Sequence, residues 1–166
     1  MRVVKVLQAA VVAFVGIVAQ PVMAEEDIGF SDQQTKRTVD IFAYGVSECA
    51  KVDLVYRVDC LRQTYSQTVR VISKASVYWE AEVALTRVNR GLYSFVRANT
   101  DSNLGRERVN GGRIKAVTQE SLPQAIQLYM AGADRAAEVM RSGSSIESRY
   151  FAPIADAVEA SKALLQ

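Results

Sequence analysis

The chain has 166 residues, of which 49% are hydrophobic and 23% charged, and its formal net charge is +2. This balance is typical of a single globular domain and differs from the strongly basic composition of nucleic-acid-binding proteins. With only three prolines and nine glycines, the sequence predicts neither collagen-like repeats nor long disordered linkers.

The first 24 residues have the pattern of a secretory signal peptide. Arg2 and Lys5 precede an almost uncharged apolar run over residues 6–18, and small residues up to Ala24 form a cleavage site. The run is shorter than the roughly 20 apolar residues of a membrane span, so we favour cleavage over an uncleaved membrane anchor. We therefore expect a mature domain of residues 25–166 that does not span the membrane. It should reside in the periplasm or outside the cell, as after export by a Gram-negative bacterium.

Three amphipathic segments are predicted before residue 100. Ser31 and Gln34 have the spacing of a capping box at the start of the first, and Asp59 is the candidate cap of the second. The stretch 52–58 alternates in polarity, and we interpret it as a connection. The apolar residues of the three segments recur with the helical period: Val39, Phe42, Val46 and Cys49; Val58, Leu61, Tyr65, Val69 and Ile72; Ala81, Leu85, Val88, Leu92 and Phe95.

Turn-forming residues separate the third helix from the rest of the chain. Between Asn99 and Gly112 the sequence is rich in Asp, Ser, Asn and Gly. Asn110 and Gly111 have the composition of a two-residue hairpin turn. We expect a flexible basic loop over about residues 100–113.

Two further helices are predicted after this loop. Ser121 is the expected cap of the fourth, with Pro123 in its first turn, where proline is tolerated. Gly143 is expected to end it, and one of the two serines that follow should start the last helix. Pro153 should kink that helix or delay its start. The two apolar stripes are Leu122, Ile126, Tyr129, Ala133, Ala137 and Met140, and then Ile146, Tyr150, Ile154, Ala157, Ser161 and Leu165.

Five amphipathic segments predict an all-α fold, a bundle of about four main helices plus a short or peripheral one. The two cysteines, Cys49 and Cys60, should be bonded in an oxidising compartment. On one continuous helix their Cα atoms would lie about 16 Å apart, whereas a disulfide needs less than about 7 Å. We therefore expect one helix to end near Cys49 and another to start near Cys60. A redox-active pair is the alternative, but the C-x-x-C spacing that lowers a thiol pKa is absent.

The sequence offers little catalytic chemistry. It contains no histidine, which excludes the serine and cysteine triads that depend on histidine and most haem and zinc sites. Four glutamates are candidates for acid–base catalysis: Glu80, Glu82, Glu120 and Glu138. Their spacing does not bring any two of them together as a pair, so the simpler interpretation is that they lie on solvated helix surfaces. No catalytic residue, metal ligand or cofactor is predicted.

Positive charge is concentrated in residues 87–115, which hold seven basic and two acidic residues. The loop contributes Arg106, Arg108, Arg113 and Lys115, a candidate basic site for an acidic partner or an anionic envelope surface. The alternative is a solvated surface without a partner. After removal of the leader, 18 basic and 18 acidic residues remain, so nucleic-acid binding is not expected.

The third helix carries a candidate interaction face opposite its apolar stripe: Trp79, Val83, Arg90, Tyr93 and Arg97. Aromatic, aliphatic and arginine side chains are the composition of an interface centre. A central helix in a bundle contacts partners on two sides, however. We therefore favour a neighbouring helix that covers Trp79 over an exposed interface.

Three functional hypotheses fit these observations. The first is an exported helical protein of the bacterial cell envelope that binds another protein, or itself, through the candidate face without catalysis. The second is a small anion-binding protein or histidine-independent enzyme with an Arg/Glu site inside the bundle, against which a filled core would argue. The third is electrostatic attachment to a membrane surface, which salt should weaken.

Overall fold

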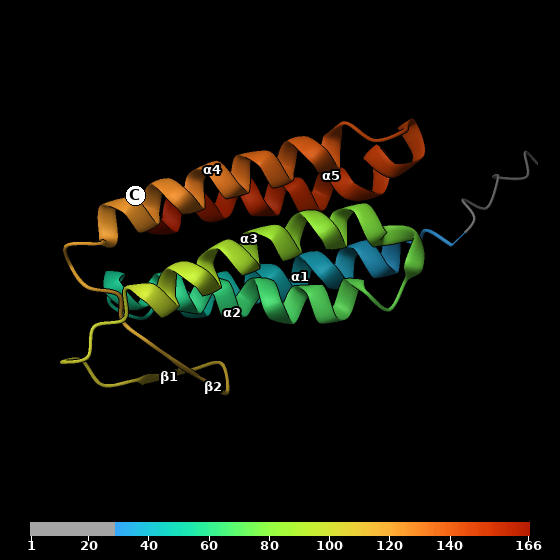
Figure 1. Ribbon diagram of the computed structural model, residues 1–166. Helices are drawn as coiled ribbons and strands as arrows, with labels where there is room; N and C mark the ends of the chain where they lie inside the picture. The colour runs from blue at the N-terminus through green and yellow to red at the C-terminus, as the bar shows by residue number, and fades with distance from the viewer. Residues whose placement is uncertain (1–28) are drawn as a thin grey trace, which may run out of the picture.

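The computed structural model describes residues 29–166, which form an all-α bundle with one small β-hairpin (Figure 1). The predicted fold class is confirmed. The signal-peptide prediction lies outside the described residues. The elements in this part of the chain are α1 (Asp32–Cys49), α2 (Leu54–Ile72), the 3₁₀ turn η1 (Ser76–Tyr78), α3 (Trp79–Ala98), β1 (Glu107–Val109), β2 (Gly112–Ile114), α4 (Leu122–Arg141), α5 (Ser145–Ala160) and the 3₁₀ turn η2 (Ser161–Leu165).

The five helices close into a ring. Each packs against the next in sequence, and α5 packs back onto α1. Figure 1 shows α4 and α5 on one side of the bundle, α1, α2 and α3 on the other, and the hairpin beside α2 at one end. No helix within residues 29–166 has the length and apolar character to cross a membrane.

The core is built mainly from the predicted apolar stripes, although Ile146, which was placed in the last stripe, is 46% exposed. One large side chain from each helix is at most 1% exposed: Phe42, Leu61, Leu85, Tyr129 and Ile154. The five helices have similar lengths, between 16 and 20 residues. All five therefore contribute to one core, with no short or peripheral helix among them.

The start of α2 differs from the prediction. The helix begins at Leu54, after Asp53, so residues 54–58 belong to α2 and not to a connection, and Asp59 is not a cap. Asp59 is 3% exposed inside the helix. The alternating pattern arises because this turn of α2 is buried on two sides: Val58 packs into the bundle core, whereas Tyr56 packs under the hairpin.

Helix ends follow the local sequence closely. The Ser31 hydroxyl accepts a hydrogen bond from the Gln34 amide at 3.1 Å and caps α1. Ser144 and Glu147 form a reciprocal capping box at the start of α5. Pro153 lies inside α5 and does not delay its start. Ser121 occupies the N-cap position of α4 but makes no capping hydrogen bond.

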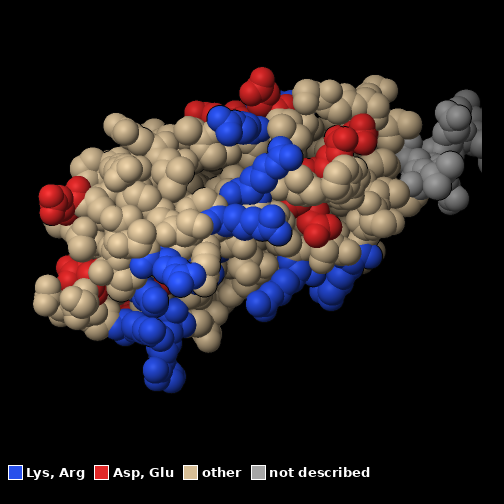
Figure 2. Space-filling model, viewed as in Figure 1, with Lys and Arg blue, Asp and Glu red and all other residues tan. Residues whose placement is uncertain are grey.

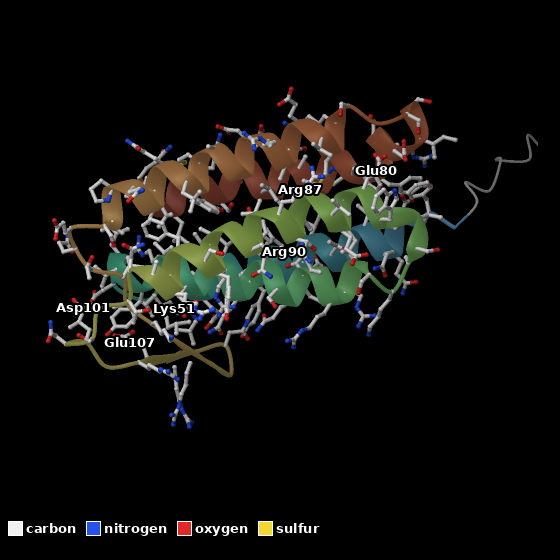
Figure 3. The ribbon with its side chains drawn as sticks, in the orientation of Figure 1. Lys51, Glu80, Arg87, Arg90, Asp101 and Glu107 are labelled. Carbon is white, nitrogen blue, oxygen red and sulfur yellow. A yellow bond between two sulfur atoms is a disulfide. The ribbon has the colours of Figure 1, made fainter. Side chains whose placement is uncertain are left out.

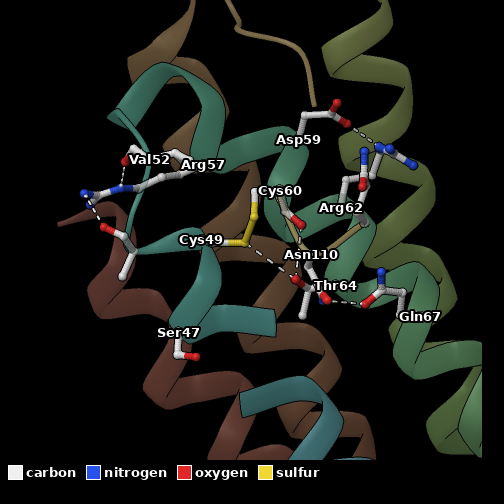
Figure 4. Close-up of a disulfide and its surroundings, with 12 residues drawn as sticks. Ser47, Cys49, Val52, Arg57, Asp59, Cys60, Arg62, Thr64, Gln67 and Asn110 are labelled. Atoms are coloured by element: carbon white, nitrogen blue, oxygen red, sulfur yellow. Dashed lines mark hydrogen bonds and ion pairs between the residues drawn. A yellow bond between two sulfur atoms is a disulfide. The ribbon is translucent and has the colours of Figure 1, made fainter. Parts of the chain in front are cut away.

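The Cys49–Cys60 disulfide is present and joins α1 to α2 with a Cα–Cα distance of 5.6 Å (Figure 4). As predicted, α1 ends at Cys49. Cys60, in contrast, lies well inside α2 and not at its start, because the chain already turns back at residues 50–53. Arg57 supports this turn through a hydrogen bond from its Nε to the Val52 carbonyl at 2.9 Å.

The segment expected as a flexible basic loop folds around a β-hairpin. Asn110 and Gly111 have φ angles of 48° and 74°, both positive as a type I′ turn requires, so this turn is confirmed. Three hydrogen bonds tie the hairpin to α2. The Lys115 amide donates to Asp59 at 2.8 Å, the Gln63 amide group donates to the Arg113 carbonyl at 2.7 Å, and the Asn110 side chain donates to Gln67 at 3.0 Å.

Candidate interaction groove

Trp79, the only tryptophan in the chain, is 61% exposed. The preference for a neighbouring helix that covers it is therefore wrong. The buried position at this corner belongs to the preceding residue, Tyr78, which is fully buried and whose hydroxyl donates to the Ser31 carbonyl at 2.9 Å. Tyr78 is directed towards the start of α1, whereas Trp79, the next residue in the chain, is directed towards solvent.

An open groove of about 240 Å³ runs between α3 and α4. We call it the α3–α4 groove; its lining is Ala84, Arg87, Val88, Gly91, Leu92, Leu128, Ala131, Gly132, Arg135, Ala136 and Val139. Small residues on both helices leave this space unfilled. At Gly91, for example, no atom of another described helix lies within 4 Å of the place that a Cβ would take.

A second hollow, of about 400 Å³, continues the groove towards Trp79. It is lined by Trp79, Glu80, Val83, Arg87, Val139, Ser142, Gly143 and Glu147, so it shares Arg87 and Val139 with the groove. From Trp79 to Leu92, α3 rises by about 20 Å at 1.5 Å per residue. The combined depression is therefore long enough to hold about four turns of a helix.

Two arginines stand on opposite walls of the α3–α4 groove, Arg87 on α3 and Arg135 on α4. Both are exposed, and within residues 29–166 neither forms an ion pair or a side-chain hydrogen bond. Figure 3 shows Arg87 between the two helices and Glu80 at the start of α3. Figure 2 shows basic side chains that cross the same face of the bundle.

The two acidic residues at the Trp79 end of the depression differ in whether their carboxylates are already hydrogen-bonded. The carboxylate of Glu147 accepts hydrogen bonds from the Ser144 hydroxyl at 2.7 Å and the Ser144 amide at 2.8 Å. These bonds lower the pKa of Glu147, and its charge is used in capping α5. Glu80 makes no such bond within the described residues.

The candidate face predicted on α3 is divided between two sides of the helix. Trp79 and Val83 line the depression. Arg90 and Arg97 are exposed outside it, and Tyr93, 53% exposed, lies against the Arg62 guanidinium of α2 at 5.9 Å from its ring centre. Sequence reasoning missed Arg87 and Arg135, and the available signal was the small residues, such as Gly91, that recur on α3 and α4.

The structure brings some of the basic side chains of the candidate loop together. Arg108 and Arg113 are directly opposite each other in the hairpin register and both are exposed. Arg106 is exposed just before β1, whereas Lys115 is half-buried and follows β2.

The bundle interior gives no support to an Arg/Glu site. Among the described residues, the buried polar side chains include neither arginine nor glutamate. Within the core, the Tyr129 hydroxyl hydrogen-bonds with Ser161, and the Tyr129 ring packs against the ring of Tyr65. Burial raises the pKa of Tyr65 well above its usual value, so this phenol stays neutral. No group of three potential metal-binding side chains is found within residues 29–166.

Comparison of the chain with protein-family models, with curated proteins and with solved structures finds no match.

Proposed function

We propose that the protein is a non-catalytic binding protein of the bacterial cell envelope whose α3–α4 groove takes an amphipathic helix of a partner protein. The partner helix carries apolar residues on one face and acidic residues on both flanks. The observation that carries the proposal is an apolar groove, unfilled between two helices, with an arginine on each wall that has no ion-pair partner within residues 29–166. The disulfide is compatible with an oxidising compartment such as the periplasm.

The shape of the groove favours a helix over a small ligand. Small-molecule pockets enclose 70–90% of the ligand surface, whereas this groove is open and its rim residue Leu128 is 38% exposed. A third helix packs naturally into the groove between two others. Gly91 and Gly132 on the two walls permit its backbone to come close.

Charge selects the kind of helix. Arg87 and Arg135 present guanidinium groups from both walls, and guanidinium pairs well with carboxylates. A partner with glutamate or aspartate on both flanks of its apolar face therefore satisfies the two arginines at once. Trp79, exposed at one end, supplies the aromatic contact that is common at interface centres.

A second copy of the same chain fits this surface poorly. In a two-fold dimer the same patch faces itself, so a concave groove would meet a concave groove. Arg87, shared by the two hollows, lies near the middle of the depression and would face its own copy. We therefore commit to a different, acidic helix.

The test uses Trp79 as a built-in probe, because it is the only tryptophan. Two amphipathic peptides of about 14 residues, long enough for about 20 Å of helix, share one leucine-rich face and lack Trp and Tyr. One has glutamate on its flanks and the other lysine. We expect the glutamate peptide to shift Trp79 fluorescence and to bind about tenfold more tightly than the lysine peptide.

The double variant Arg87→Glu/Arg135→Glu should reverse this preference. The matched control, Arg90→Glu/Arg97→Glu, makes the same change of charge on the exposed side of α3 outside the groove. It should change the preference for the glutamate peptide less than the double variant in the groove does. Circular dichroism checks that both variants fold. Equal affinity for the two peptides, or an unchanged preference in Arg87→Glu/Arg135→Glu, contradicts the proposal, as does concentration-dependent dimerisation through the groove.

A further inference from the structure

The β-hairpin places two like charges in direct opposition. Arg108 and Arg113 are cross-strand partners, so their Cβ atoms lie about 4.5–5.5 Å apart. Both are exposed, and within the described part of the chain neither forms an ion pair or a side-chain hydrogen bond. Like charges in this position destabilise a hairpin, and an anion held between them removes that cost.

The acidic residues of this end lie on the other side of the hairpin. Glu107 is paired with Ile114 in the register, so it is on the face opposite to Arg108. Its charge, with that of Asp53 and Asp101, adds to the effect of burial in raising the pKa of Tyr56. Glu107 therefore does not neutralise the outer face, which carries the two arginines, and Figure 2 shows a cluster of basic side chains at this end.

The hairpin is a fixed support for the two arginines. Val109 and Ile114, on its inner face, are buried in a cluster with Cys49 and Cys60. The buried carboxylate of Asp59 holds the chain after β2 by accepting the Lys115 amide at 2.8 Å. Side chains presented from a support of this kind lose little further freedom on binding.

An exposed leucine lies in the loop that leads into the hairpin. Leu104 is 44% exposed, two residues before Arg106, and its loop is tied to the bundle by the hydrogen bond from the Tyr56 hydroxyl to the Gly105 carbonyl at 2.8 Å. Figure 1 shows this loop beside the hairpin at the same end of the molecule. An apolar side chain among arginines is the composition of a site that binds the surface of an anionic bilayer.

We infer that the outer face of the hairpin, Arg108 and Arg113 with Arg106 and Leu104, binds the phosphate groups of an anionic lipid membrane. The arginines contact the phosphates, for which guanidinium geometry is suited, and Leu104 enters the boundary between head groups and acyl chains. A soluble phosphate would use the arginines but would leave Leu104 without a role. This site lies on the α2 side of the bundle, away from the α3–α4 groove, so it does not depend on the proposed partner.

The experiment is co-sedimentation of the oxidised protein with vesicles. Vesicles of phosphatidylglycerol and phosphatidylcholine should bind the protein, and vesicles of phosphatidylcholine alone should not. Binding should weaken steeply as sodium chloride is raised. The variant Arg108→Gln/Arg113→Gln should bind at least about tenfold more weakly, since two basic residues near the surface are lost. Its fold should be at least as stable as that of the wild type, because repulsion is removed.

Two further variants make the test specific. Arg37→Gln/Lys74→Gln removes the same charge from exposed positions on α1 and after α2, and it should keep binding within about twofold. Leu104→Ser should weaken binding in a way that persists at high salt. Equal loss in both double variants, no binding to anionic vesicles, or full competition by inorganic phosphate at constant ionic strength would overturn the inference.

Discussion

The hairpin corner and the α3–α4 groove both carry arginines that form no ion pair within the described residues, but their apolar residues are packed differently. At the corner, Val109 and Ile114 are buried against the disulfide, and the outer face carries arginines with one exposed leucine, Leu104. In the groove, the apolar floor stays open between Arg87 and Arg135. Binding at the hairpin corner should therefore depend mainly on electrostatic attraction, which salt screens. Binding in the groove should depend mainly on burial of apolar surface, and charge should decide which partner binds.

Two glycines near these regions differ in the same way. Gly45 of α1 faces Thr64 of α2, and a Cβ there would lie 2.5 Å from the threonine side chain, so the space is already filled. Gly91 of α3 has no atom of another described helix within 4 Å of the corresponding place. Near the disulfide, where Cys49 also contacts Thr64, glycine permits two helices to pack closely. In the groove, glycine leaves the surface unfilled.

The largest expected effect comes from removal of the disulfide. Cys49→Ala/Cys60→Ala should lower the free energy of unfolding by about 3 kcal/mol, the cost of releasing so short a loop in the unfolded chain. Urea denaturation measures this loss. Hydrogen exchange should show faster opening of the hairpin amides than of α3, because the hairpin packs on the disulfide. A loss below about 1 kcal/mol, or equal opening of both regions, would contradict the special role of the corner.

Features set by a few neighbouring residues were predicted well from the sequence. The two-residue turn at Asn110 and Gly111, the cap at Ser31 and the end of α1 at Cys49 are confirmed. Of the two serines expected to start α5, the first, Ser144, is the cap. Each depends on local backbone conformation or on a covalent distance limit. For the same reason the five apolar stripes predicted the five helices, because burial of one face imposes the helical period.

What the sequence did not predict depends on contacts between distant elements. The start of α2 was misplaced because Tyr56 is buried by the hairpin and Val58 by the bundle, which gives an alternating pattern on a helix. The exposure of Trp79 was missed because periodicity shows which side of a helix is apolar, and not whether another helix covers the opposite side. Arg87 and Arg135 come together only through the packing of α3 against α4.

Substitution of Gly45 and of Gly91 by alanine should change the free energy of unfolding in opposite directions. Gly45→Ala should lower the free energy of unfolding by about 1–3 kcal/mol, because the methyl group overlaps Thr64. Gly91→Ala, its matched control, should raise it by about 0.5–1 kcal/mol, because alanine is the better helix former and meets no neighbour. The same methyl group occupies the α3–α4 groove, so Gly91→Ala should weaken binding of the glutamate peptide. Destabilisation by Gly91→Ala would show that the groove is already filled in solution.

The smallest effect concerns Glu147, at the Trp79 end of the depression. Its hydrogen bonds to Ser144 lower its pKa in the folded protein, so it stabilises the fold above its unfolded pKa, about 4.3, and this contribution is lost as the pH falls through the lower, folded value. We expect Glu147→Gln to be less stable than the wild type at pH 7 by under about 1 kcal/mol, since the carboxylate is largely solvated. This gap should narrow in thermal or urea unfolding below about pH 4. Ser144→Ala removes the hydrogen-bond partner of Glu147, so in that background the difference in stability between glutamate and glutamine at position 147 should depend little on pH.

The affinity for the glutamate peptide should change little in Glu147→Gln if the carboxylate is used in the cap of α5. A marked gain in affinity would mean that the charge of Glu147 reaches into the groove.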